Sequence, residues 1–365
     1  MKVLISGGGT GGHIYPAISI AKKIMEKRKD ADILYIGTKK GLEADIVPKE
    51  GIEFKSIRIK GFQRKLSVDT AKSALELFKG MNDARRIIKE YKPDLVIGTG
   101  GYVCGPLLLI ASLKNIPTLI HEQNAFPGAT NRILSKFVDK IACGFDGTEK
   151  YFKTPSKITV TGNPIRAEFQ NIDREKIRSE LNCDNKKVIL SFGGSGGQRS
   201  LNDAMFKLIK DYRDREDIQI YNVTGKRFWD SFIEKLKEEG LNDIDNSKVM
   251  EYCYNLPSYI AASDLIVTSA GAITIAEITA LGIPSIIVPK RYTTENHQEY
   301  NARTLEEKGA SKMILEKDLD EIDFTKEIDS IINNQEVLNN MREKSKEIGI
   351  INATDRIYDI IEQLI

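Results

Sequence analysis

A glycine-rich stretch that ends in a histidine, Gly7-Gly8-Gly9-Thr10-Gly11-Gly12-His13, lies near the start of the chain. The aliphatic run Lys2–Ser6 precedes it, and helical periodicity follows over Tyr15–Lys29, so we expect a strand, a glycine turn and a helix. Glycines let a ligand approach the main chain, and a helix N-terminus offers free N–H groups to an anion. The same terminus disfavours an imidazolium, so His13 is either a neutral group that accepts a proton or a structural cap.

A second unit of the same kind begins about halfway along the chain. The strand-like run Val188–Phe192 leads into Gly193-Gly194-Ser195-Gly196-Gly197, and helical periodicity follows over residues 201–209. Ser195 would donate its hydroxyl to a diphosphate oxygen. Two copies of this strand–glycine loop–helix unit indicate that the chain has two similar halves.

Polar residues follow several other strand-like runs. Gly98–Tyr102 ends one run, and His121-Glu122-Gln123-Asn124 ends the next with four polar side chains in succession. In the second half, Thr268–Thr274 ends a strand and opens a helix that carries Glu277. That carboxylate would accept two ribose hydroxyls, whereas a surface glutamate is the plainer interpretation. Gln298, at a polar helix start, would read sugar hydroxyls with its amide.

Two other motif interpretations fit less well. Gly7-x-Gly9-x-x-Gly12 satisfies the dinucleotide pattern, but the second strand ends in Tyr35–Thr38, without the acidic residue that holds a ribose. Gly193-x-Ser195-x-Gly197, with Asp264 and His297 downstream, fits a nucleophile elbow but leaves the first glycine loop unexplained.

Length and composition limit the classes of protein to which the chain can belong. A chain of 365 residues exceeds the usual single core, which favours two domains. The net charge of +2 argues against a nucleic-acid partner. The four cysteines are scattered and the three histidines lie far apart, so we expect neither disulfides nor a metal site. We also expect neither a signal peptide nor a membrane span.

Strand-like runs alternate with helical segments along the whole chain, which predicts an α/β protein with parallel sheets covered by helices on both faces. Ligands of such sheets bind at the carboxyl ends of the strands, where the glycine loops fall. Gly162-Asn163-Pro164 closes the first half, and we expect the final stretch, Val337–Ile365, to be helical. The predicted strands are Lys2–Ser6, Ile33–Gly37, Phe54–Ile59, Leu95–Gly98, Thr118–His121, Lys140–Cys143, Ile158–Thr161, Val188–Phe192, Ile218–Val223, Val249–Tyr252, Leu265–Thr268, Ser285–Val288 and Lys312–Leu315.

Basic residues surround an apolar set between Gly61 and Met81. A basic rim around an apolar helix face is typical of a membrane-surface patch. The plainer interpretation is a solvated helix whose apolar face belongs to the core.

Taken together, these motifs resemble those of the MurG-type N-acetylglucosaminyltransferases of bacterial cell-wall synthesis, in glycosyltransferase family 28. The resemblance spans nearly the whole chain and follows the family's order. It rests on Gly8–His13, Gly98–Pro106, His121–Asn124, Gly162–Arg166, Gly193–Ser195 and Ser269–Glu277.

The resemblance implies a GT-B fold with two Rossmann-like domains and a cleft between them. Residues 1–162 would form the acceptor- and membrane-associated domain, with a C-terminal helix of about residues 345–365 packing back onto it. Residues 163–344 would bind the donor, UDP-N-acetylglucosamine. The acceptor would be lipid I, an undecaprenyl-diphosphate-linked muramoyl pentapeptide, and the product lipid II. The family works peripherally at the cytoplasmic face of the membrane, which favours the membrane interpretation of Gly61–Met81 and implies an anionic lipid surface as a partner. No cofactor and no metal is implied.

The resemblance also implies roles for individual residues. From the first domain, Thr10, Gly11 and Gly12 would contact the donor and Asn124 its sugar. In the second domain, Arg166 and Ser195 would face the diphosphate, and Gln298 the sugar hydroxyls. Ribose and phosphate would be held by Ala272, Ile273, Thr274, Ile275, Ala276 and Glu277, and the uracil by the backbone of Cys253. One departure is Gly196, where the family often has glutamine or leucine, with Gln198 two residues on; it puts a side-chain contact from this loop in doubt.

The implied chemistry is an inverting transfer. An acceptor hydroxyl attacks the anomeric carbon, while helix N-termini, loop N–H groups and Arg166 stabilise the departing diphosphate. A base must take the hydroxyl proton, and the candidates are His13 first and Glu122 second. Two rival functions remain: a glycosyltransferase with another lipid acceptor, such as diacylglycerol, and a non-catalytic subunit that binds a nucleotide sugar.

Overall fold

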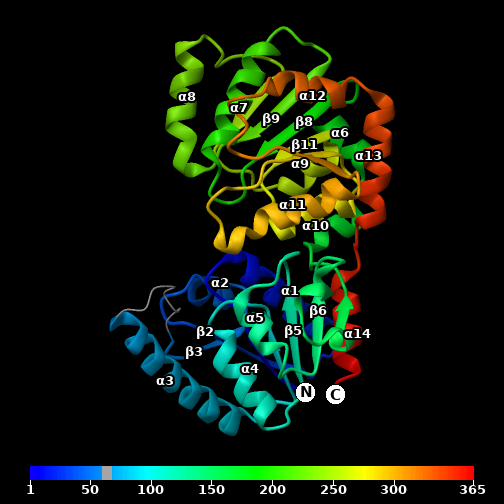
Figure 1. The fold of residues 1–365 in the computed structure, drawn as a ribbon. Helices are drawn as coiled ribbons and strands as arrows, with labels where there is room; N and C mark the ends of the chain where they lie inside the picture. Colours follow the sequence, from blue (N-terminus) through cyan, green and yellow to red (C-terminus); the bar gives the residue numbers. More distant parts are fainter. Residues whose placement is uncertain (60–67) are drawn as a thin grey trace. The chain divides into compact units, whose positions relative to one another are not determined.

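Contacts within the computed structural model divide the chain into two units, Met1–Ile165 with Asn352–Ile365, and Arg166–Ile351. The structure describes residues 1–59 and 68–365, with the backbone alone for residues 68–75. Each unit is built on its own parallel sheet (Figure 1). The expected α/β class with two parallel sheets is therefore confirmed.

The sheet of the first unit has the strand order β3-β2-β1-β4-β5-β6-β7, and every neighbouring pair is parallel. This is the Rossmann order, in which the chain reverses direction across the sheet beside β1. All seven strands lie where the sequence predicts them. They are β1 (Lys2–Ser6), β2 (Asp32–Gly37), β3 (Glu53–Ser56), β4 (Leu95–Gly98), β5 (Thr118–Glu122), β6 (Lys140–Cys143) and β7 (Ile158–Val160).

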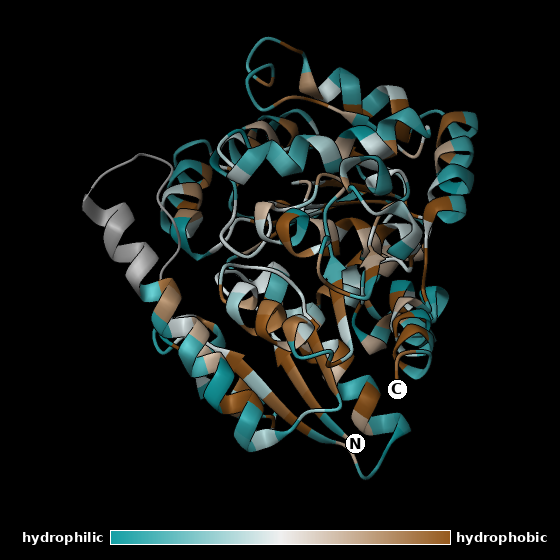
Figure 2. Ribbon diagram, turned by 60° about the horizontal axis from the view of Figure 1, so that its bottom comes forward, coloured by the Kyte–Doolittle hydropathy of each residue, from teal (hydrophilic) through white to brown (hydrophobic). Residues whose placement is uncertain are grey.

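Helices cover both faces of this sheet because each buried strand is apolar on both sides. Val3 and Ile5 of β1 pack on one face with the first and last helices, and Leu4 packs on the other. Figure 2 shows that these strands are largely hydrophobic, whereas each covering helix carries both hydrophobic and hydrophilic residues. The helices are α1 (Gly11–Lys27), α2 (Glu43–Lys49), α3 (Val68–Tyr91), α4 (Cys104–Leu113), α5 (Ala129–Leu134) and α14 (Ala353–Glu362), with short 3-10 turns η1 (Thr148–Tyr151) and η2 (Pro155–Lys157).

The C-terminal stretch Val337–Ile365 is helical, as expected, and it consists of two helices. The helix that packs back onto the first unit begins at Ala353, later than the expected start near residue 345. Helix α13 (Gln335–Ile348) ends at Gly349, where an added Cβ would lie 2.2 Å from the carbonyl oxygen of Thr279. The close approach requires glycine here, and the backbone leaves the helical conformation at this residue (φ −63°, ψ 131°). Helix α14 begins four residues later and packs on α1, where Arg28 pairs with Glu362 through two hydrogen bonds. Residues 345–351 belong to the second unit.

The second unit repeats the plan with the strand order β10-β9-β8-β11-β12-β13, again all parallel. All six predicted strands are present. They are β8 (Lys187–Phe192), β9 (Ile218–Val223), β10 (Ser247–Met250), β11 (Leu265–Thr268), β12 (Ser285–Ile287) and β13 (Ser311–Met313).

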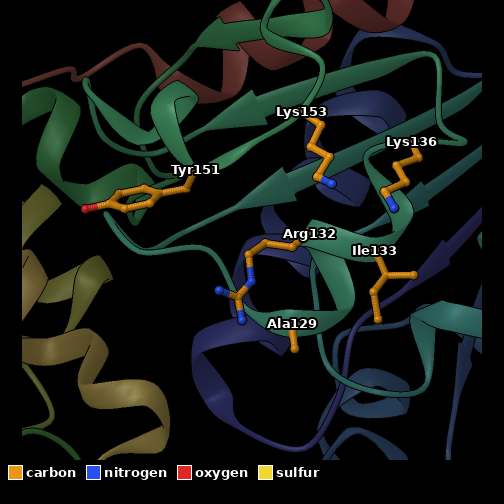
Figure 3. Close-up of a pocket in the computed structure, with 6 residues that line it drawn as sticks. All are labelled: Ala129, Arg132, Ile133, Lys136, Tyr151 and Lys153. Carbon is orange, nitrogen blue, oxygen red and sulfur yellow. The ribbon is translucent and has the colours of Figure 1, made fainter.

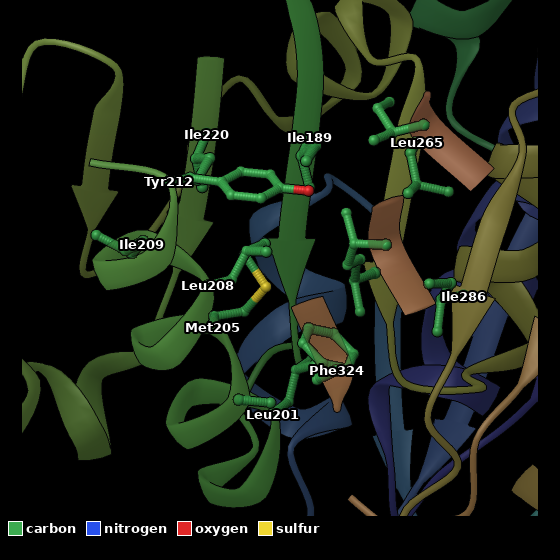
Figure 4. Packing of buried hydrophobic residues seen from close by; sticks show 14 of the residues in the cluster. Ile189, Leu201, Met205, Leu208, Ile209, Tyr212, Ile220, Leu265, Ile286 and Phe324 are labelled. Atoms are coloured by element: carbon green, nitrogen blue, oxygen red, sulfur yellow. The ribbon is translucent and has the colours of Figure 1, made fainter. Parts of the chain in front are cut away.

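One large hydrophobic cluster of the second unit lies between this sheet and helices that include α7 and α12 (Figure 4). Leu201, Met205 and Leu208 recur at helical spacing on α7 and are fully buried. The hydroxyl of Tyr212, just after α7, donates to Asp329 at 2.6 Å and satisfies its polar end. The helices are α6 (Arg174–Glu180), α7 (Arg199–Asp211), α8 (Trp229–Glu238), α9 (Leu256–Ala262), α10 (Ala272–Ala280), α11 (His297–Glu307), α12 (Phe324–Ile332) and α13, with 3-10 turns η3 (Ala167–Asn171), η4 (Lys226–Phe228) and η5 (Thr294–Asn296).

The described residues contain neither a candidate membrane span nor a candidate metal cluster. Among residues 1–59 and 68–365, no helix has both the length and the apolar character needed to cross a bilayer. Within those same ranges, no group of three His, Cys, Asp or Glu side chains could hold a metal ion.

Candidate functional site

The first glycine loop turns from β1 into α1 and packs against the loop that follows β4. Gly9 has φ +85°, which a glycine adopts without strain. A Cβ on Gly101 would lie 2.4 Å from the carbonyl oxygen of Gly8, so the two loops touch backbone to backbone. Thr10 and Gly12 are exposed and Gly11 is half-buried, so all three are accessible to a ligand.

His13 is held in one orientation at the start of α1. Its Nδ1 lies 2.9 Å from the carbonyl oxygen of Gly8, which can only accept, so in the neutral ring Nδ1 carries the proton and Nε2 the lone pair. A Cβ on Gly100 would lie 2.9 Å from Nε2, so the glycine leaves room for the ring. The imidazole bonds the loop and not a helix N–H, which favours the proton acceptor over the structural cap.

This loop presents fewer donors to an anion than its glycine content predicts. The N–H of Gly9 donates to the carboxylate of Glu43, and Glu43 is fully buried. A negative charge behind the loop opposes a phosphate in front of it. The first loop is therefore not an electrostatic copy of the second.

Glu122, the second candidate base, has both carboxylate oxygens engaged. Oε1 accepts from the backbone and side-chain amides of Asn124 at 3.0 and 3.3 Å. Oε2 accepts from the N–H of Gly128 at 3.0 Å and from the amide of Asn131 at 2.8 Å. Since the group is buried, this geometry favours Glu122 as the residue that orders the loop and sets the position of Asn124. Sequence reasoning missed Asn131.

His121 is a buried structural residue. Its Nδ1 accepts from the amide of Gln123 at 2.9 Å, and its Nε2 lies 3.2 Å from the carbonyl oxygen of Gly162. The amide of Asn163 in turn donates to the backbone of Gln123 at 2.9 Å. Burial lowers the pKa of His121 to about 4, against the opposing effect of the Gly162 carbonyl, so the ring is neutral near pH 7.

We expect His121 to make the protein sensitive to mild acid. The unfolded chain binds the proton below about pH 6.5 and the folded chain only near pH 4, so stability is full above pH 6.5 and falls as the pH drops. His121→Gln can keep both hydrogen bonds and removes the titration. Between pH 7 and pH 4.5 the variant should lose about 2 kcal/mol less unfolding free energy than the parent, as measured by denaturant titration. An unchanged pH slope would contradict this assignment, and His297→Gln is the matched control.

The second glycine loop is more open to a ligand. Gly194 and Gly197 have φ +74° and +71°, and the N–H of Gly197 donates to the carbonyl oxygen of Gly194 at 3.0 Å. This turn leaves Ser195 exposed at its tip. A Cβ on Gly197 would lie 2.2 Å from the carbonyl oxygen of Thr224, so the loop is fixed against the end of β9.

A charged group that the sequence analysis did not single out supports this loop. The Nζ of Lys290, just beyond β12, donates to the carbonyl oxygen of Gly197 at 2.8 Å, and burial lowers the pKa of Lys290. Glu316 accepts from Gln198 at 3.0 Å and from Ser200 at 2.5 Å. Gln198 is therefore a buried support of the loop. Lys290 follows an apolar strand, and this position in the sequence could have identified it as a candidate residue.

Arg166 and Glu277 form a two-pronged ion pair, a partnership that the sequence analysis did not predict. Arg166 donates from Nε to Oε1 at 2.7 Å and from Nη2 to Oε2 at 3.0 Å. The Glu277 side chain is 6% exposed and that of Arg166 is 39% exposed. Burial raises the pKa of Glu277, while Arg166 acts in the opposite direction. Each carboxylate oxygen keeps a second lone pair for a ribose hydroxyl.

The residues from Ala272 to Ala276 form the first turns of α10, which Gly271 precedes as N-cap. The first turn of a helix leaves its N–H groups outside the intrahelical ladder, and Ile273 and Thr274 stand there half-buried. By contrast, the N–H of Ile275 donates to the carbonyl oxygen of Gly271 at 2.9 Å, and its side chain is buried. Ile275 therefore packs the helix against the core, and any contact to a ligand comes from its neighbours.

Gln298 and Asn301 hold the loop before α10 from the side. The Oε1 of Gln298 accepts from the N–H of Lys290 at 2.9 Å and of Ala270 at 3.3 Å. Asn301 is buried and donates to the carbonyl oxygen of Ala270 at 3.1 Å. The amide nitrogen is therefore the group that Gln298 can offer to a sugar. Cys253 is half-buried in the segment that follows β10.

Comparison with protein families gives two matches that together cover most of the chain. Residues 3–143 match the glycosyltransferase family 28 N-terminal domain, and residues 188–364 match the glycosyltransferase family 28 C-terminal domain. The matches end within β6 and begin within β8, so each contains the glycine loop of its unit.

Curated proteins resemble the chain over its full length. It is 48% identical over 365 residues to the UDP-N-acetylglucosamine--N-acetylmuramyl-(pentapeptide) pyrophosphoryl-undecaprenol N-acetylglucosamine transferase of Thermoanaerobacter sp. (strain X514), covering 100% of both chains. It is 49% identical to the protein of the same name from Acetivibrio thermocellus, covering 100% of this chain and 98% of that one.

Solved structures agree with this result. The crystal structure of Acinetobacter baumannii MurG matches with a TM-score of 0.79 and 27% identity over 99% of each chain, which confirms the expected GT-B type of fold. UDP-GlcNAc 2-epimerase from Neisseria meningitidis, bound to UDP-GlcNAc, matches with a TM-score of 0.68 at 16% identity over 100% of each chain, a likeness of fold alone.

Proposed function

Because the chain belongs to glycosyltransferase family 28, we propose that it transfers N-acetylglucosamine from UDP-N-acetylglucosamine to the 4-hydroxyl of the muramoyl sugar of lipid I. The product is lipid II, and the anomeric centre is inverted. The observation that carries the proposal is the 48% identity, over the full length, to curated transferases of that name. The two glycine loops and the fixed imidazole of His13 are the parts that this chemistry needs.

The second unit holds the donor in this proposal. Ser195 and the first-turn N–H groups of α10 bind the diphosphate, where the positive end of the helix stabilises the charge that grows on the leaving group. Glu277 accepts the ribose hydroxyls and Arg166 reaches the diphosphate from its place beside Glu277. Gln298 binds the sugar through its amide nitrogen, and the backbone near Cys253 binds the uracil.

The first unit activates the acceptor. Nε2 of His13 takes the proton of the attacking hydroxyl, whose oxygen bonds to the anomeric carbon as the bond to UDP breaks. Glu122 sets the position of Asn124, which binds the sugar. Thr10, Gly11 and Gly12 contact the donor through their accessible backbone.

The test is transfer of radiolabel from UDP-N-acetylglucosamine to a short-chain analogue of lipid I, with diacylglycerol in a parallel reaction. Label in the analogue alone supports the proposal. Label in diacylglycerol would favour a glycosyltransferase with another lipid acceptor, and donor binding without any transfer would favour a non-catalytic binding subunit.

We also propose that the protein works peripherally at the cytoplasmic face of the membrane, against anionic lipid. Much of the predicted patch between Gly61 and Met81 lies outside the described residues. Of the described part, Leu77 and Met81 pack against the core, whereas Phe78 is 69% exposed. Leu113 on α4 and Ile133 on α5 are also more than 60% exposed, and α4 packs against both α3 and α5.

A basic pocket includes one of these exposed apolar residues, Ile133, in its lining. It has a volume of about 330 Å³, and no carboxylate is among the residues that line it: Ala129, Arg132, Ile133, Lys136, Tyr151 and Lys153. Figure 3 shows Lys136 and Lys153 extending toward the same space, while Tyr151 points away. Cations gathered next to exposed apolar side chains match the headgroup and acyl layers of an anionic bilayer.

We expect the double substitution Lys136→Gln with Lys153→Gln to weaken binding to phosphatidylglycerol vesicles about 30-fold at low salt, since each lost cation removes one favourable surface interaction. Vesicle co-sedimentation measures the change. Lys207→Gln with Lys237→Gln, in the second unit, removes the same charge and should have little effect. Equal losses in both pairs would mean that total charge, and not this pocket, sets binding.

A further inference from the structure

Glu43 lies behind the first glycine loop and is the first residue of α2. Its side chain is fully buried. Oε1 accepts from the N–H of Thr38 at 2.9 Å and from its hydroxyl at 2.7 Å, and Oε2 accepts from the N–H of Gly9 at 3.3 Å. Three donors converge on the group, as an ionised carboxylate requires.

One peptide group joins this carboxylate to the imidazole of His13. The N–H of Gly9 and the C=O of Gly8 belong to the same peptide bond. The N–H donates to Glu43, and the C=O accepts from Nδ1 of His13 at 2.9 Å. Hydrogen bonds in a chain polarise one another, so the carboxylate makes the Gly8 oxygen a stronger acceptor for Nδ1–H.

Close packing fixes this chain of bonds. A Cβ on Gly8 would lie 2.8 Å from Oε1 of Glu43, and one on Gly41 would lie 2.3 Å from the same carboxylate. On the other side of the loop, the hydroxyl of Thr99 donates to the backbone oxygen of His13 at 2.7 Å. Glycine is therefore required where the carboxylate approaches the loop.

The other titratable side chains bonded to these segments are neutral near pH 7. Burial raises the pKa of Tyr35, whose hydroxyl donates to the carbonyl oxygen of Gly7 at 2.7 Å. Burial also raises the pKa of Cys104 to about 11, and its thiol donates to the carbonyl oxygens of Ser6 and Gly100. Glu43 therefore supplies the negative charge on this side of His13.

We propose that Glu43 is a positioning residue that acts on His13 through the Gly8–Gly9 peptide; this inference rests on the proposed function, in which His13 is the base. When Nε2 takes the hydroxyl proton, an O–H bond breaks and an N–H bond forms. The oxygen lone pair attacks the anomeric carbon, and the electrons of the broken C–O bond leave with UDP. The ring becomes positive while Nδ1 keeps its proton. Glu43 fixes the tautomer and stabilises the imidazolium, as the aspartate of a catalytic triad does by direct contact.

The test is a double-mutant cycle between Glu43→Gln and His13→Ala. Glu43→Gln keeps the shape and removes the charge, so kcat should fall about 10- to 100-fold, less than for direct triad contact because a peptide intervenes. In the His13→Ala background the same substitution should change kcat less than about twofold, since the residue it serves is gone. The acid limb of the kcat profile should also move to lower pH.

Asp139→Asn is the control. Asp139 accepts from both the N–H and the hydroxyl of Thr118, at the N-terminal end of β5, just as Glu43 accepts from both groups of Thr38. The substitution should leave kcat unchanged. If Glu43→Gln does not fold, Thr38→Val loosens the carboxylate more mildly and should lower kcat only when His13 is present. Equal losses in both His13 backgrounds, or no loss in either, would overturn the inference. Absence of transfer by the parent protein would instead refute the proposed function.

Discussion

His13→Ala is expected to lower kcat by about 10²- to 10⁴-fold, the usual contribution of a positioned general base. The ring's Nδ1–H is bonded to Gly8, which leaves Nε2 as the proton acceptor. The donor is assigned mainly to the second unit, so its affinity should change less than about threefold. Steady-state kinetics with the lipid I analogue and calorimetric binding of UDP measure the two effects separately.

His13→Asn separates the base from the loop. Its side-chain amide can still donate to the carbonyl oxygen of Gly8, but it offers no basic nitrogen. We expect a loss of turnover similar to that of His13→Ala. If donor affinity fell in either variant while turnover remained, His13 would be a binding residue and the base would lie elsewhere.

Glu277→Ala is expected to raise the KM for the donor about 100-fold, since the two ribose hydroxyls that we propose it binds would lose a buried carboxylate acceptor. Arg166 then loses its ion-pair partner, but it is 39% exposed and can be solvated. Calorimetry with UDP and with 2′,3′-dideoxy-UDP measures the effect. UDP should lose affinity in the variant, whereas the dideoxy nucleotide should bind the parent and the variant alike.

Glu277→Gln is the companion variant. It keeps one acceptor oxygen and gives up the charged pair with Arg166, so its loss of UDP affinity should lie between those of the parent and Glu277→Ala. If both nucleotides lose affinity equally in Glu277→Ala, the residue supports the site through Arg166 and does not contact the ribose.

Local sequence pattern was enough to predict the sheets. Runs such as Val3–Ile5 and Val188–Leu190 are apolar on both faces because parallel strands are buried on both sides, and a glycine loop follows each. The place of the loops follows from topology, since parallel strands end at one edge of their sheet. Spacing therefore located the glycine loops and polar residues at these edges, whereas most individual binding roles came from the family resemblance.

Partnerships between distant residues were not visible in the sequence. Arg166 and Glu277 are 111 positions apart, and only the fold of the second unit brings them together. The break between α13 and α14 depends on Gly349 touching the backbone near Thr279. Periodicity reports which face of a helix is apolar, but not what the chain meets at its end.

The two glycine loops show most clearly that a local motif does not reveal the charged residues that pack behind it. Their sequences are alike, yet the buried carboxylate of Glu43 bonds the first loop, whereas the second is supported by both a half-buried ammonium, Lys290, and a carboxylate, Glu316. The Glu43 carboxylate opposes an anion at the first loop, while the Lys290 ammonium offsets Glu316 at the second. The difference comes from residues outside both motifs.

NMR of the isolated disaccharide product tests most directly whether the protein performs an inverting transfer to one hydroxyl of the muramoyl sugar. Starting from the α-linked donor, we expect a β-linked N-acetylglucosamine on the 4-oxygen of that sugar. An α linkage, or attachment at another oxygen, would contradict it.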